Sequence, residues 1–168
     1  MKRPRYGRPN RLSLFVIMLL NALVGSLVLY LVCTLFGVAS IVIGQLAAHG
    51  IKISDRWGMV LPMLPGIGIG MGCLWFWLVL VGRTRGVQWG GAAVYGALIA
   101  VCNVPIAALI LGLLAGVEPN GLLLMMLIAF ALLMLSPALS LAMLLSGAIL
   151  GLFNARLAHD WIAWYKRQ

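Results

Sequence analysis

Charged side chains are scarce in this chain. It has only three acidic residues against twelve lysines and arginines, and 64% of its residues are hydrophobic. An ordinary soluble domain is about 25% charged, because its surface faces water. With 9% charged residues, the chain lacks the polar side chains that a soluble surface needs. The composition therefore excludes an ordinary soluble domain.

Charges are absent altogether from four long runs. These runs cover residues 12–48, 57–82, 87–117 and 119–155. A helix needs about 20 apolar residues to cross the ~30 Å hydrocarbon core of a bilayer, and each run is long enough. The sequence predicts an all-α integral membrane protein with one membrane domain, residues 1–168. Its four-helix bundle is expected to contain helices at roughly residues 12–47, 57–82, 87–116 and 121–155.

Acidic residues and histidines are too few and too scattered for most membrane chemistry. Asp55, Glu118 and Asp160 all lie between or after the apolar runs, and His49 and His159 are expected on opposite sides of the membrane. Proton-coupled transport usually relies on an ionisable group within the membrane. The three cysteines have no metal-binding or disulfide spacing. We therefore expect no enzyme activity, no cofactor and no metal site.

The positive residues are sorted between the two sides of the predicted bundle. With four crossings, only Lys52 and Arg56 lie on one side, and the other ten cations lie on the opposite side with both termini. The positive-inside rule then places both termini in the cytoplasm. The short loops and the basic N-terminus favour a bacterial inner membrane. Because these cations set orientation, we expect lipid contact and no nucleic-acid binding. The expected cytoplasmic basic anchor consists of Lys2, Arg3, Arg5, Arg8, Arg11, Arg83 and Arg85.

The positions of proline and of the aromatic residues refine the prediction for the last run and for the segment after it. Pro137 lies near its middle and is expected to kink one long helix. The alternative is two short crossing helices divided at Pro137, which would place the C-terminal cations outside, against the charge rule. After the run, Leu157, Trp161, Trp164 and Tyr165 fall at helical spacing. Residues 156–168 are therefore predicted to form a short interfacial amphipathic helix.

The second run carries four alternating glycines. Gly66 and Gly70 share one helix face, while Gly68 and Gly72 lie about 200° around on the opposite face. Small residues allow close approach between membrane helices, so this helix is expected to lie between two neighbours. Alternatively, prolines and glycines over residues 62–72 could break the helix and leave carbonyl groups lining a cavity.

Small and polar residues in the other runs mark further contact faces. Glycines and serines at helical spacing suggest that each helix has a seam where another backbone can approach. The expected packing residues here are Ser26, Gly37, Gly44, Gly96, Gly147 and Gly151. The three polar side chains that could line a solute path are Asn103, Ser136 and Ser140.

Packing surface is thus abundant while chemically active residues are few. The sequence favours a non-catalytic integral membrane subunit, which packs through small-residue helix faces within a larger membrane complex or a homo-oligomer. Its expected partners are the lipid bilayer and other membrane subunits or copies of itself. The alternative is a small permease or channel, whose broken second helix at residues 62–72 would line a solute path.

Overall fold

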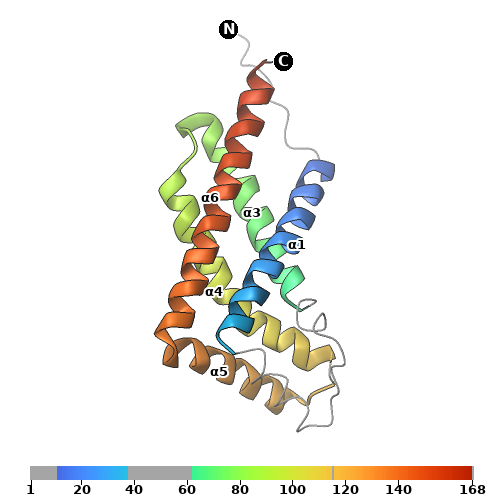
Figure 1. Cartoon of the computed structure of the whole chain (residues 1–168). Helices are drawn as coiled ribbons and strands as arrows, with labels where there is room; N and C mark the ends of the chain where they lie inside the picture. The colour runs from blue at the N-terminus through green and yellow to red at the C-terminus, as the bar shows by residue number, and fades with distance from the viewer. Residues whose placement is uncertain (1–10, 38–61, 115, 168) are drawn as a thin grey trace.

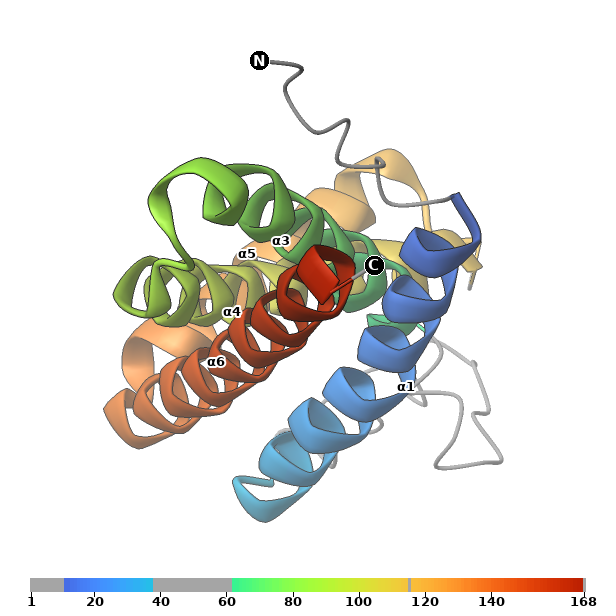
Figure 2. The same cartoon turned by 90° about the horizontal axis from the view of Figure 1, so that it is seen from above.

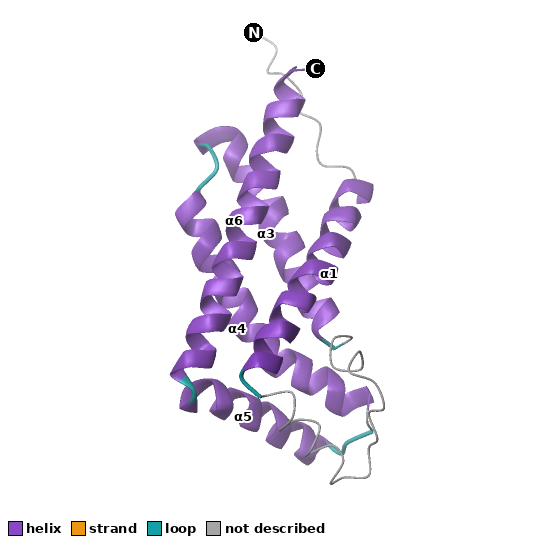
Figure 3. Cartoon of the chain, in the orientation of Figure 1, coloured by secondary structure: helices purple, strands orange, loops and turns teal. Residues whose placement is uncertain are grey.

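The computed structural model describes residues 11–37, 62–114 and 116–167 (Figure 1). This part of the chain is helical and contains no strand (Figure 3). Its elements are α1 (Arg11–Leu35), α3 (Met63–Arg85), α4 (Trp89–Leu114), α5 (Pro119–Leu135) and α6 (Pro137–Arg167). The all-α fold class predicted from the composition is confirmed.

Four of the helices are long and apolar enough to cross a membrane. The membrane-length segments are Arg11–Leu35, Met63–Gly82, Trp89–Leu114 and Pro137–Trp164. α5 has 17 residues and is only about 26 Å long at 1.5 Å per residue, less than the ~30 Å hydrocarbon core. The chain is therefore a multi-pass helical membrane protein.

The fourth crossing is not the helix predicted at residues 121–155. The chain leaves helical geometry at Ser136, where φ is −116° and ψ is 86°, and α6 begins at Pro137. Proline disfavours a helical conformation in the residue before it and has no N–H to continue the hydrogen-bond ladder. α5 lies across the ends of the long helices, while α6 returns along the bundle (Figure 1). Proline thus produces a corner here, and neither a kink nor a pair of short crossing helices.

The C-terminal amphipathic segment is not a separate helix. α6 runs without interruption to Arg167, since no proline or glycine follows Gly151. The Arg156 Nε and Asp160 Oδ2 atoms, one turn apart, lie within 3.1 Å. The indole ring of Trp161 packs edge-on against that of Trp75 in α3, with ring centroids 5.6 Å apart. The segment is therefore packed on the bundle as the last turns of α6.

α1 ends earlier than the predicted boundary at residue 47. Gly37 adopts a φ of 70°, and its N–H donates to the Thr34 carbonyl at 3.1 Å. Glycine is favoured in this left-handed conformation after a helix end. Among the described residues, a Cβ at Gly37 would have no neighbour within 4 Å, so the packing role of Gly37 stays a prediction. Gly44 and the other residues of 38–47 lie outside the described part.

The long helices pack around α3 and α6. α3 contacts α1, α4 and α6, while α1 contacts α3 and α6, and the most extensive contact joins α4 to α6. The view from above shows α1 and α4 on either side of this arrangement (Figure 2). The core between the helices contains fully buried Leu29, Ile67, Trp75 and Met143.

Glycines bring α4 and α6 together backbone to backbone. A Cβ added to Gly96 would lie 2.7 Å from the Gly151 Cα, and one added to Gly147 would lie 2.8 Å from the Ala97 Cα. Both distances are shorter than van der Waals contact allows. Burial drives little association in lipid, so such close approach between small residues is a main attractive term.

Gly151→Ala is expected to separate these two helices. Its Cβ would overlap the Ala92 backbone, and neither backbone can move aside locally. Overpacking of this kind costs about 1–3 kcal/mol, which thermal or denaturant unfolding in one detergent will measure. The matched control is Gly90→Ala, where a Cβ meets nothing within 4 Å and stability should stay the same or rise slightly. Equal stability of the two variants would contradict the close packing.

Candidate functional site

Two buried carboxamides join α1 to α6. The Asn21 Nδ2 donates to the Asn154 Oδ1 at 2.9 Å, and the Asn154 Nδ2 donates to the Asn21 Oδ1 at 2.7 Å. Each Nδ2 also donates to the carbonyl one turn earlier, of Ile17 and Leu150, at 2.9 Å. Both side chains are almost completely buried. All four carboxamide N–H groups therefore have an acceptor.

The pair fixes the register of α1 against α6. An asparagine inside an apolar run is a candidate for a hydrogen bond between helices, but the sequence does not indicate that Asn21 and Asn154 bond each other. The two residues are 133 positions apart. Helical periodicity predicts the helix face on which each asparagine lies. Which residue it bonds depends on the position of α1 relative to α6 along the helix axes.

The α4 side of α3 is lined by Gly66 and Gly70. A Cβ at Gly66 would collide with the Asn103 Oδ1, and one at Gly70 would lie 2.7 Å from the Ile99 Cγ2. Both contacts come from α4, which therefore approaches closely along this face of α3.

The α1 side of α3 is lined by Gly68 and Gly72. A Cβ at Gly68 would lie 2.9 Å from the Ala22 Cβ and 3.1 Å from the Met18 carbonyl oxygen. One at Gly72 would collide with the Met18 side chain. The structure thus places the four glycines on two faces of α3, with a different helix against each.

α3 is unbroken over the residues where the alternative prediction placed a loop. It is helical from Met63 to Arg85. Pro62 occupies the N-cap position, and Pro65 lies in the first turn, where the N–H groups have no partner within the helix. Both prolines are therefore compatible with a continuous helix, and the predicted break at residues 62–72 is wrong.

Asn103 of α4 lies at the contact between α4 and α3. The side chain is 1% exposed, and within the described residues neither its Nδ2 nor its Oδ1 has a hydrogen-bond partner. Its Oδ1 occupies the space where a Cβ of Gly66 in α3 would lie. Ser26 of α1 is also fully buried, and its Oγ has no partner in the described part of the chain.

The side chains of Ser136 and Ser140 form hydrogen bonds at the corner between α5 and α6. The Leu139 N–H donates to the Ser136 Oγ at 3.4 Å, and the Ser140 Oγ donates to the Leu133 carbonyl. Ser136 thereby caps the first turn of α6. In the described structure no hydrogen bond links either serine to Asn103, so the three residues of the predicted polar path do not form one group.

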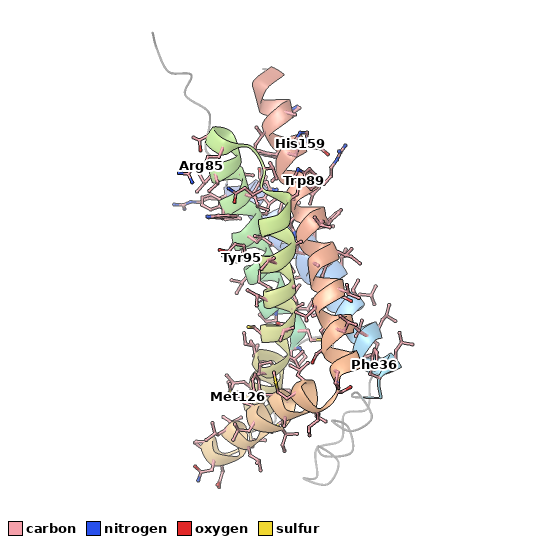
Figure 4. The ribbon with its side chains drawn as sticks, turned by 90° about the vertical axis from the view of Figure 1, so that its left-hand side faces the viewer. Phe36, Arg85, Trp89, Tyr95, Met126 and His159 are labelled. Atoms are coloured by element: carbon pink, nitrogen blue, oxygen red, sulfur yellow. The ribbon has the colours of Figure 1, made fainter. Side chains whose placement is uncertain are left out.

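The described members of the basic anchor lie at the end of the bundle where α1 begins and α3 and α6 end (Figures 1 and 4). Arg11 begins α1, and Arg85 ends α3 next to Trp89. Arg83 lies within α3, and Lys2, Arg3, Arg5 and Arg8 are outside the described residues.

Aromatic rings gather near the same end. The Trp89 ring lies 6.3 Å from that of His159, and Trp161 contacts both Trp75 and Trp164. Tryptophan is enriched where membrane helices meet the headgroup region. No group of three or more metal-ligating side chains occurs in the described part of the chain.

Asn21→Leu alone or Asn154→Leu alone should destabilise the protein more than the two substitutions do in combination. Each single substitution leaves one buried carboxamide without its partner, whereas the double variant removes both polar groups. A double-mutant cycle of unfolding free energies in one detergent should give a coupling of about 0.6–2 kcal/mol. Additive effects would contradict the reciprocal pair. Thr34→Val is the control for loss of one bond within α1.

Comparisons with protein-family models, with curated proteins and with solved structures give no match. The functional argument therefore depends on the residues and contacts described above.

Proposed function

We propose that the chain is a non-catalytic integral membrane subunit that assembles with a larger membrane complex or with copies of itself. The observation that supports this most directly is the use of its small and polar residues. The glycines of α3, α4 and α6 bring the chain's own helices together, and Asn21 bonds Asn154 between α1 and α6. These groups serve a stable bundle rather than a reactive centre.

Contacts with a partner would then use the outer faces of the helices. Those faces carry large apolar side chains, among them Phe15 (62% exposed) on α1 and Ile149 (66%) on α6. α5 adds exposed Leu123, Leu127 and Phe130 across one end. Such surfaces suit lipid tails or other apolar helices. Because the predicted small-residue faces are used internally, the subunit would associate through these larger side chains.

We also propose that both termini face the cytoplasm of a bacterial inner membrane. The basic residues Arg11, Arg85 and Arg156 support this orientation. Arg11 begins α1, Arg85 ends α3 and Arg156 lies in the C-terminal half of α6, and these parts of the three helices lie at the same end of the bundle (Figure 1). Glu118 begins the segment at the opposite end. The positive-inside rule assigns the cation-rich end to the cytoplasm.

A solute path is the second candidate function. Asn103 favours it, because a buried carboxamide without a partner offers hydrogen bonds to a polar solute. The continuous α3 and the separate bonds of Ser136 and Ser140 count against it. We therefore rank it below the subunit proposal.

Purification in a mild detergent tests the subunit proposal. A tagged chain expressed in its own host membrane should elute with a partner at fixed stoichiometry, or as a multiple of 18.1 kDa. Mass spectrometry of the intact complex distinguishes these two forms. The control is the same purification in a harsh detergent, which should release the monomer.

A single monomeric species without a partner in the mild detergent would contradict the subunit proposal. In that case, reaction of Asn103→Cys with a water-soluble thiol reagent in intact membranes would support the solute path. Cys33 is buried, and the exposed Cys73 and Cys102 should be replaced first.

Reporter fusions test the orientation. A fluorescent protein that folds only in the cytoplasm should be active when fused after Gln168, because the last helix would end there. A phosphatase that works only outside the cytoplasm should be active when fused after Glu118, and inactive after Gln168. The reverse pattern, or the same activity at both sites, would contradict the proposed orientation.

A further inference from the structure

Three asparagines are buried between the helices, but their surroundings differ. Asn21 and Asn154 bond each other and also donate to backbone carbonyls one turn earlier. Asn103 is equally buried, yet among the described residues its carboxamide has no partner at either atom. The equivalent backbone acceptor for Asn103 is the carbonyl of Ile99, which it does not use. The contrast indicates that something else satisfies this side chain.

The Asn103 carboxamide fits against α3 because residue 66 is a glycine and has no side chain. Its Oδ1 lies where a Cβ of residue 66 would be, so only glycine leaves room for the carboxamide. Gly66 follows directly on the first turn of α3, which starts at Met63. The polar atoms of Asn103 therefore lie within about one helical turn of the start of α3.

The start of α3 carries hydrogen-bond donors that have no acceptor within the helix. The first N–H groups of a helix have no acceptor within it, and the two in question belong to Met63 and Leu64. Pro62 at the N-cap position makes no side-chain capping bond. The Asn103 carboxamide, which has no partner among the described residues, lies within about one turn of these donors along α3.

The ligand that fits is small, uncharged, and both a donor and an acceptor. Ile106 of α4 lies beside the Gly66–Asn103 contact, and Ile99 of α4 lies against Gly70 one turn further along α3. Neither side chain carries a charge that could neutralise an ion. Water meets these requirements, and buried water commonly satisfies polar groups that the chain leaves unpaired.

We propose that the Asn103 carboxamide binds buried water between α3 and α4, close to the first turn of α3. The water occupies a polar site inside an otherwise apolar helix contact. It completes the hydrogen bonding of Asn103 in the way that Asn154 completes that of Asn21.

Solid-state NMR of the full chain in liposomes tests this directly. With ¹⁵N-labelled asparagine, magnetisation transfer from water protons to each side-chain amide is measured. The transfer to Asn103 should build up severalfold faster than the transfer to Asn21 and Asn154, whose bonds leave no donor for water. Asn120 is exposed at the start of α5 and serves as the positive control.

The Asn103 signal can be assigned in two ways. Asn103→Leu should remove it and leave the other asparagine signals in place. If that variant does not fold, a ¹³C label on the cysteine carbonyl identifies the backbone amide of Asn103 in the unaltered chain, because Cys102–Asn103 is the only cysteine–asparagine pair in the sequence. Correlations within ¹³C,¹⁵N-labelled asparagine then assign the side-chain amide of the same residue. Transfer to Asn103 as slow as that to Asn21 and Asn154 would overturn the proposal. The result does not depend on whether the protein has a partner.

Discussion

Helices in a bilayer gain little from hiding apolar surface from one another, because lipid tails are equally apolar. What holds this bundle together is the close approach of backbones where side chains are missing. Gly96, Gly147 and Gly151 bring α4 against α6, and the glycines of α3 admit a neighbour on each side. The rest of the structure depends on these contacts, since they determine which helices touch and how near they come.

Polar groups complete the arrangement. A carboxamide inside a helix bundle needs a partner, because the surrounding lipid offers no hydrogen bonds. Asn21 and Asn154 meet that need by bonding each other across the α1–α6 contact. Asn103 lies in the α3–α4 contact made possible by Gly66. Glycine therefore acts twice, by bringing helices together and by leaving space for a polar side chain.

The corner at Ser136 and Pro137 shapes the opposite end of the molecule. It divides an uninterrupted apolar run into α5, which is too short to cross the bilayer, and α6, which crosses it. Ser136 caps α6 and Ser140 bonds back to α5. The polar residues at the corner stabilise the turn itself, and within the described residues neither forms a hydrogen bond with Asn103.

The sequence alone determined the class of the protein and the number of membrane-length helices, because charge-free runs and their lengths follow directly from composition and the bilayer thickness. It also determined that Gly66 and Gly70 lie on one face of a helix and Gly68 and Gly72 on the other, because helical periodicity is local. Only the tertiary structure decided that the last run turns at Pro137, since the same proline can kink a helix or end it. Only the tertiary structure showed that Asn21 bonds Asn154 while Asn103 has no partner in the described part of the chain. The register between helices far apart in the chain depends on packing rather than on periodicity.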